Sequence, residues 1–355
     1  MTTDNRQMWA DLGIDLERHD QLLAALPSIY NEIYLSQKDR PKGMGFFDFV
    51  VGDIHGIRVQ ELRKHAMNDG KVVATYCVFV PEEIVLAAGA VAVGLCAGAQ
   101  FSVPIAEEVL PRNTCALIKS SYGFKLGRVF PYVQTSHLIV GETTCDGKKK
   151  MFELLAEQHP VYVMEVPNKK TERSRGLWRG EVAAFKDVIE KLTGNRIDEE
   201  KLAKASKLVN DRRRALQRLS NARKANPVPI SGKDALLVTQ VSFYDDPARC
   251  IQQVNALCDE VEARVARGEG VFPKGAPRIL VSGSPMAIPN WKLHHLLESA
   301  GAAVVCEESC TGTRAFSDLV AETGGSLEKQ LNAIAERYMQ IHCACFTPND
   351  ERLDD

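Results

Sequence analysis

The stretch that decides the fold is residues 72–95, which read VVATYCVFVPEEIVLAAGAVAVGL. Its first part, Val72–Phe79, is rich in β-branched and aromatic residues and predicts a strand. Pro81 and the two acids after it predict a helix start, because proline suits the first helical turn and carboxylates suit the positive end of the helix dipole. Gly89 ends this helix, and Val91–Leu95 predicts the next strand. The stretch therefore predicts a strand–helix–strand unit.

The alternation of short apolar runs with helical patterns continues along the chain. Further strands are predicted at His137–Val140, Val161–Met164, Arg278–Val281 and Ala303–Cys306. A second alternation is predicted to begin with a strand at Ala235–Val238, and Ile341–Phe346 is predicted as the last strand. Such alternation is typical of parallel sheets covered by helices on both faces. We therefore expect an α/β fold with two domains joined by helices.

Composition divides the chain into four predicted segments. They are an N-terminal helical segment (1–45), a first α/β domain (46–166), a helical connector (167–230) and a second α/β domain (231–355). The connector is dense in charge, and its Leu202, Val209 and Leu216 recur every seven residues. That spacing predicts an amphipathic helix packed on one side.

Charge and hydropathy exclude several functional classes. The formal net charge of −2 over 355 residues lacks the basic excess that phosphate neutralisation needs, so we expect no nucleic-acid partner. The least polar stretch, residues 84–99, is shorter than the roughly 20 residues of a membrane-spanning helix. The N-terminus lacks the basic and apolar pattern of a signal peptide, so a cytoplasmic location is expected. The chain also has no phosphate-binding loop, so another protein would handle any nucleotide.

The chain has ten cysteines, more than packing alone explains in a compartment that keeps thiols reduced. Six lie in predicted loops or at strand ends, namely Cys96, Cys115, Cys145, Cys310, Cys343 and Cys345. Thiolates favour zinc or iron–sulfur clusters. The sequence has no Cys-x-x-Cys knuckle and no ferredoxin run, so dispersed cysteines favour a cluster held between two domains.

The other cysteines have structural interpretations. Cys77 falls inside a predicted strand, and Cys250 and Cys258 share a predicted helix, where packing is the ordinary role of a free thiol. Cys306 ends a predicted strand and is ambiguous. On the predicted last strand, Cys343 and Cys345 would point to one face, either as ligands or as two core thiols.

Several motifs resemble the 2-hydroxyacyl-CoA dehydratase / benzoyl-CoA reductase family. Residues 76–90, YCVFVPEEIVLAAGA, resemble its opening signature. The likeness is closer to one branch, the double-cubane cluster proteins. It rests on Gly94–Gly98, Cys115–Phe124, Gly141–Met151, Glu307–Arg314 and Cys343–Asn349. It extends from about residue 45 to the C-terminus.

The resemblance implies two flavodoxin- or Rossmann-like domains with an iron–sulfur cluster between them. In the double-cubane branch, two [4Fe-4S] cubanes share a bridging sulfide to form an [8Fe-9S] cluster, and each cubane is held by three cysteines. Carried over, the ligands are Cys96, Cys115 and Cys145 from the first domain and Cys310, Cys343 and Cys345 from the second, with Cys77 and Cys306 as possible replacements.

The resemblance also implies partners and a reaction. Proteins of that branch are anaerobic homodimers that receive low-potential electrons from an ATP-hydrolysing iron–sulfur reductase and reduce small molecules such as acetylene, azide or hydrazine. One alternative is a 2-hydroxyacyl-CoA dehydratase subunit with a single [4Fe-4S] cluster, and another is a non-enzymatic electron-transfer protein. Ser284 and Phe130 stand where some relatives carry cysteine. Lys119, Lys148 and Arg314 are expected to place positive charge near the anionic cluster.

Overall fold

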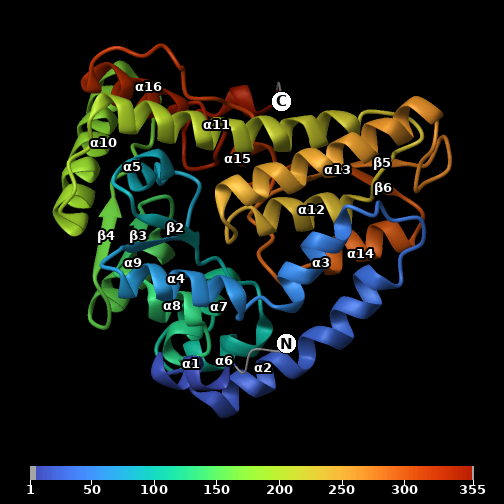
Figure 1. Cartoon of the computed structure of the whole chain (residues 1–355), viewed down its shortest axis with the longest axis horizontal. Coiled ribbons are helices and arrows are strands. Elements are labelled where there is room, and N and C mark those ends of the chain that lie inside the picture. The colour runs from blue at the N-terminus through green and yellow to red at the C-terminus, as the bar shows by residue number, and fades with distance from the viewer. Residues whose placement is uncertain (1–4, 354–355) are drawn as a thin grey trace.

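The computed structural model describes residues 5–353, and strands alternate with helices through much of the chain (Figure 1). The strands are β1 (Val72–Thr75), β2 (Val91–Gly94), β3 (Leu138–Glu142), β4 (Val161–Met164), β5 (Arg278–Ser282) and β6 (Ala303–Glu308). They form a four-stranded sheet and a two-stranded sheet, and every pairing within them is parallel. The prediction of an α/β fold with parallel sheets is confirmed.

The four-stranded sheet has the strand order β2-β1-β3-β4. This is the order of the flavodoxin-like folds, in which the chain direction across the sheet reverses between β1 and β3. The helices between its strands are α5 (Glu82–Ala87), α6 (Val103–Ala106), α7 (Ala116–Leu126), α8 (Pro131–Thr135) and α9 (Asp146–Ala156), with a short 3₁₀ turn, η2 (Gln100–Ser102). Ligands of such sheets bind beyond the carboxyl ends of the strands at the reversal point.

Both faces of this sheet are covered, which explains why its strands are continuous apolar runs. Val72 and Ala74 of β1 belong to one hydrophobic core, whereas Val73 between them belongs to a second. Figure 1 shows α8, α9 and α4 (Ile57–Met67) on one side of the strands, with α5 and α10 (Glu172–Thr193) on the other. The period of two along β1 therefore assigns successive side chains to opposite cores.

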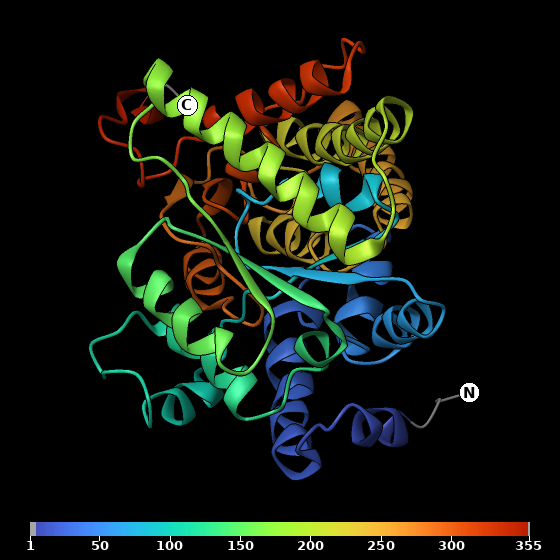
Figure 2. The same ribbon diagram turned by 90° about the vertical axis from the view of Figure 1, so that its left-hand side faces the viewer.

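The N-terminal segment and the connector are helical, as the sequence predicts. The first consists of α1 (Arg6–Asp11), α2 (Leu16–Tyr30) and a π-helical turn, η1 (Asn31–Leu35), followed by α3 (Met44–Gly52). The connector contains α10 and α11 (Glu199–Ala222). Leu202, Val209 and Leu216 all lie on the buried side of α11, so its amphipathic pattern is confirmed. Figure 1 shows α11 running beside α13 (Pro247–Arg267), and Figure 2 shows α10 crossing the molecule close to α16 (Leu327–Met339).

The strand predicted at Ala235–Val238 is wrong, because these residues lie in helix α12 (Gly232–Val241). Ser231 caps this helix by accepting a hydrogen bond from the Asp234 N–H over 3.1 Å. All ten residues of α12 are buried. Polar residues such as Lys233 and Gln240 are buried along with the apolar run 235–238, so burial in this helix does not follow an amphipathic period. A short apolar run of this kind cannot be told from a buried strand by its periodicity.

The strand predicted at Ile341–Phe346 is also wrong. The segment is irregular, and the Phe346 N–H donates to the Cys343 carbonyl over 3.1 Å to close a turn. Phe346 is buried against Phe79, with ring centroids 5.8 Å apart. Its side chain therefore anchors a turn and does not belong to a strand. Among residues 5–353, the second sheet therefore contains only β5 and β6. The helical elements of this last part of the chain include α14 (Lys292–Ser299), α15 (Thr313–Phe316) and a terminal 3₁₀ turn, η3 (Asp350–Leu353).

The strand predicted at Val72–Phe79 is shorter than expected. β1 ends at Thr75, which is also the last residue that pairs with β2 and β3. Cys77 consequently lies in the turn after the strand and not within it. The segment boundaries at residues 45, 166 and 230 stay a prediction.

Candidate functional site

A cavity of about 590 Å³ lies where the first part of the chain meets the second. Cysteines are its most distinctive lining: seven of the chain's ten contribute, namely Cys77, Cys96, Cys115, Cys145, Cys310, Cys343 and Cys345. All six cysteines predicted as ligands are therefore present, and the seventh is one of the two predicted replacements. These cysteines, which are far apart in the sequence, therefore line one cavity, and their role as ligands stays a prediction.

The cysteines from the first part of the chain follow the strands of the four-stranded sheet. Cys77 follows β1, Cys96 follows β2, and Cys145 follows β3 and occupies the position just before α9. Cys115 occupies the position just before α7. This places them beyond the carboxyl ends of the strands around the β1/β3 reversal, the position where sheets of this kind bind ligands.

The cysteines from the second part lie in loops. Cys310 follows β6, and Cys343 and Cys345 lie in the turn that Phe346 anchors. The expectation that Cys343 and Cys345 share a strand face is wrong. The turn instead brings their two thiols into hydrogen-bonding contact with each other.

The loop after β2 joins the two parts of the chain at the cavity. The Gly94 N–H donates to the Phe243 carbonyl over 2.8 Å, and the Gly98 N–H donates to the Ile288 carbonyl over 3.0 Å. The Tyr244 hydroxyl donates to the carbonyl of Cys96 over 2.7 Å. These bonds fix Cys96 against the second part of the chain.

Gly98 is the residue of this loop that most needs to be glycine. A Cβ atom there would lie 2.4 Å from the Ala287 carbonyl oxygen, which is backbone and cannot move aside alone. We expect Gly98→Ala to destabilise the protein by about 1–3 kcal/mol through overpacking, measured by urea unfolding. Gly180→Ala, in helix α10 with nothing near its added methyl, is the control and is expected to be neutral or stabilising. Equal unfolding midpoints for wild type and Gly98→Ala would contradict this account of the loop.

Thiol–thiol contacts connect cysteines across the cavity. A hydrogen bond between Cys77 and Cys310 lowers the pKa of Cys310 and raises that of Cys77. A second such bond lowers the pKa of Cys343 and raises that of Cys345. The first pair joins a cysteine of the first part of the chain to one of the second.

The three cations predicted near the site separate in the structure. Lys148 and Arg314 both line the cavity. Lys119 does not, because its ammonium donates to Glu107 over 2.6 Å and to the Arg112 carbonyl over 2.7 Å. Arg314 is held by Glu308, with its Nε 2.5 Å from a carboxylate oxygen. The structure therefore places two of the three predicted cations, Lys148 and Arg314, at the cavity.

The remaining cysteines do not line the cavity. Cys250 and Cys258 are fully buried on α13, in agreement with the packing role predicted for them. Cys306 lies within β6. Of the two positions where some relatives carry cysteine, Ser284 lines the cavity, whereas Phe130 is buried among the aromatic rings of Phe124 and Tyr132. Of these two, Ser284 alone is placed to affect a bound group.

The donor set fits a polynuclear cluster better than a single ion. Within residues 5–353, no three side chains of the ligating types converge on one point that could hold a metal ion. The thiols instead surround a cavity, and in an iron–sulfur cluster separate cysteines bind separate irons. Tyr76, another lining residue, has a buried hydroxyl with no hydrogen-bond partner in the described structure. Soft thiolates around an open volume are the ligands that iron–sulfur clusters use.

Two functional candidates at the cavity escaped the sequence prediction. Tyr76 lines the cavity. Glu142, the fully buried last residue of β3, does not line it but pairs with Lys148, which does. Glu142 lies two residues beyond the predicted strand His137–Val140, so its sequence position gave no sign of its burial.

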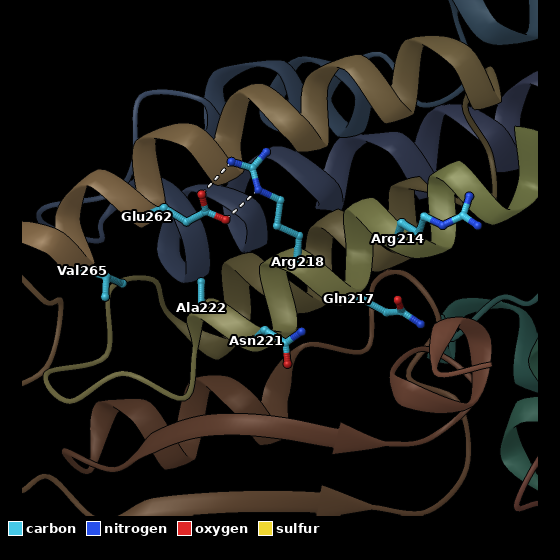
Figure 3. Close-up of a pocket in the computed structure, with 7 residues that line it drawn as sticks. All are labelled: Arg214, Gln217, Arg218, Asn221, Ala222, Glu262 and Val265. Carbon is cyan, nitrogen blue, oxygen red and sulfur yellow. Dashed lines mark hydrogen bonds and ion pairs between the residues drawn. The ribbon is translucent and has the colours of Figure 1, made fainter. Parts of the chain in front are cut away.

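A second depression lies on the surface between α11 and α13 (Figure 3). No cysteine lines it, and its Arg218 is engaged by Glu262 with a nitrogen–oxygen distance of 2.6 Å. It is therefore separate from the cysteine-lined cavity.

No helix within residues 5–353 is long and apolar enough to cross a membrane.

The fold and the cavity together define a class: an α/β protein that gathers thiols at the reversal point of a flavodoxin-like sheet. The sequence model of one family, the 2-hydroxyglutaryl-CoA dehydratase D-component, matches residues 77–355. The chain belongs to this family, and the predicted resemblance to the 2-hydroxyacyl-CoA dehydratase / benzoyl-CoA reductase family is confirmed.

Individual relatives carry both dehydratase and reductase names. The chain is 42% identical to the putative dehydratase subunit YjiM of Escherichia coli (strain K12) over 284 residues, covering 79% of this chain and 73% of the relative. It is 24% identical to the (R)-phenyllactyl-CoA dehydratase beta subunit of Clostridium sporogenes, covering 82% and 75%. It is 22% identical to a benzoyl-CoA reductase subunit of Thauera aromatica, covering 75% and 68%. The names of these relatives therefore include two dehydratase subunits and one reductase subunit.

Proposed function

We propose that this protein is the substrate-reducing component of an iron–sulfur reductase system and carries a double-cubane [8Fe-9S] cluster in the cysteine-lined cavity. The ligands are Cys96, Cys115, Cys145, Cys310, Cys343 and Cys345. When bound, the cluster supplies low-potential electrons to a small molecule.

The observation that carries this proposal is the number and origin of the thiols at one cavity. Seven cysteines line it, and two bridged cubanes with three cysteine ligands each need six. A single [4Fe-4S] cluster would leave at least three of the seven without a role. Cys77 is the thiol in excess, and its contact with Cys310 makes it the natural replacement for one of the six.

The chain's own residues prepare this site in two ways. Apolar side chains from both parts of the chain line the cavity and limit the access of water, among them Ile118, Met151, Phe243 and Ile288. A low local dielectric strengthens every charge interaction inside it. The hydrogen bonds of Gly94 and Gly98 hold the two walls together, so the thiols keep a fixed spacing.

The proposal includes partners and a location. An ATP-hydrolysing iron–sulfur reductase would donate the electrons, since the sequence contains no phosphate-binding loop with which to use ATP itself. We propose a homodimer that works anaerobically in the cytoplasm, where thiols stay reduced.

A second candidate function is that of a 2-hydroxyacyl-CoA dehydratase subunit with a single [4Fe-4S] cluster. Two of the relatives are named as dehydratase subunits, which favours it. Ser284 in the cavity wall also favours it, because a non-thiol residue there is compatible with a cluster that has one iron without a cysteine ligand.

Activity measured without oxygen separates the candidates. With an ATP-hydrolysing iron–sulfur reductase as electron donor, we expect ATP-dependent reduction of acetylene to ethylene, which consumes electrons from the partner and protons from water. Dehydration of a 2-hydroxyacyl-CoA thioester, without acetylene reduction, would replace the reductase proposal by the dehydratase. A cluster-loaded protein with neither activity would leave only electron transfer.

A further inference from the structure

Lys148 is a cation of the cavity wall that a buried carboxylate holds in place. Its ammonium is ion-paired with Glu142 at the end of β3, and only 18% of the lysine side chain is exposed. Glu142 is fully buried, and its paired oxygen also accepts a hydrogen bond from the Thr144 hydroxyl over 2.8 Å. Its other carboxylate oxygen has no hydrogen-bond partner in the described structure. A buried carboxylate of this kind is tolerated because the lysine neutralises it.

The charge of Lys148 reaches thiols from both parts of the chain. Four cavity cysteines are affected: Cys77, Cys96, Cys310 and Cys343. Contact with a second thiol, or burial in the case of Cys96, has the largest effect on the pKa of each, and the charge of Lys148 lowers the pKa of all four. Lys148, which lines the cavity, is therefore close enough to act on thiols from both parts of the chain.

Arg314 is a second cation of the cavity wall. Its charge lowers the pKa of Cys310 and of Cys343. Glu308 binds it through two hydrogen bonds, and Arg352 binds the same carboxylate over 2.8 Å. Arg314 is therefore paired within the second part of the chain, whereas Lys148 is paired with the last residue of β3 in the first sheet.

We propose that Lys148 and Glu142 form a charge pair that sets the reduction potential of the group bound in the cavity, with Lys148 stabilising the reduced form and Glu142 positioning its ammonium. This inference rests on the proposed function, because it needs an iron–sulfur cluster between the thiols.

The physical reason is the charge that reduction adds. A cluster held by thiolates is anionic, and each electron makes it more so, so a nearby fixed cation favours the reduced state. The interaction is strong in a cavity with a low effective dielectric constant. Glu142 has the opposite sign and partly offsets the lysine, so the two residues should shift the potential in opposite directions.

The first test is an EPR-monitored redox titration of the cluster-loaded protein. We expect Lys148→Met to shift the reduction potential to a more negative value and Lys148→Arg, which keeps the charge, to shift it much less. Lys150→Met is the matched control, because Lys150 lies on the same helix, is largely exposed and pairs with Glu153. The reduction potential of the Lys150→Met protein is expected to equal that of the wild type.

The second test removes the carboxylate. Glu142→Gln keeps the size of the side chain and leaves the lysine without its counter-ion, so we expect a shift to a more positive potential. The Glu142→Gln variant also tests the inference by itself if Lys148→Met fails to bind iron. Unchanged potentials in Glu142→Gln and in any iron-loaded Lys148→Met would overturn the inference and leave the proposed function intact. A wild-type protein that binds no iron would overturn the proposed function itself.

Discussion

Cys145→Ala is expected to lose about half or more of the iron bound by the wild-type protein, because one cubane loses a ligand. Cys145 is exposed, and its side chain makes no capping hydrogen bond at the start of α9. Its replacement should therefore leave the fold and its stability unchanged. Iron and acid-labile sulfide, assayed on protein purified without oxygen, give the loss, and urea unfolding of the cluster-free proteins gives the stability.

Cys258→Ala is the control with the opposite pattern. Cys258 is fully buried on α13 and belongs to the hydrophobic core, away from the cavity. Removing its sulfur leaves a small void, so we expect a loss of stability on the order of 1 kcal/mol with the full iron content retained. Full iron in Cys145→Ala, or loss of iron in Cys258→Ala, would show that the ligand set is wrong.

Arg223→Met is expected to destabilise the protein by about 3–5 kcal/mol, since it leaves a buried carboxylate without its counter-ion. Arg223 near the end of α11 forms two hydrogen bonds to Glu307 of β6, each 2.7 Å long, and a third to the Val304 carbonyl. The two side chains are only 4% and 5% exposed. The pair fixes the strand that leads directly to Cys310.

Two variants isolate the buried charge as the cause. Arg223→Met/Glu307→Gln removes the charge left behind and should recover part of the lost stability. Arg267→Met breaks an exposed pair with Glu269 and is expected to change the free energy of unfolding by less than about 0.5 kcal/mol. Equal effects of the buried and exposed replacements would contradict this account.

The dependence of stability on acid pH provides a further test of the Arg223–Glu307 pair. Burial opposes ionisation of Glu307, but Arg223 and a hydrogen bond from His294 outweigh it and lower the Glu307 pKa from its ordinary 4.5 to about 2. Because the folded-state pKa is the lower one, the stabilisation is complete above pH 4.5 and is lost as the pH falls towards 2. We expect this part of the acid dependence to be much smaller in Arg223→Met.

The first sheet was predictable because its strands carry their own local signal. β1, β2, β3 and β4 are β-branched runs bounded by turns or helix starts, and each predicted run overlaps an observed strand. α12 was not predictable in this way, because its central apolar run, residues 235–238, is too short for its periodicity to distinguish a helix from a buried strand. In such cases tertiary enclosure, and not local propensity, decides the element.

The gathering of cysteines at one cavity was predictable, but their contacts were not, and their role as ligands stays a prediction. Cysteines placed after parallel strands were expected at one sheet edge, and they lie there. The contact between Cys77 and Cys310 depends on how two distant parts of the chain dock, which no local pattern encodes. The pairing of Lys148 with Glu142 was hidden because Glu142 reads as the polar end of a strand until its burial is known.

The most direct test of the account is the iron and acid-labile sulfide content of the wild-type protein, purified without oxygen. Seven thiols line one cavity, which is enough to hold two bridged cubanes. We therefore predict about eight irons and about nine sulfides per chain. About four irons per chain would contradict the double cubane and favour the dehydratase-like single cluster. Zinc in place of iron would contradict both.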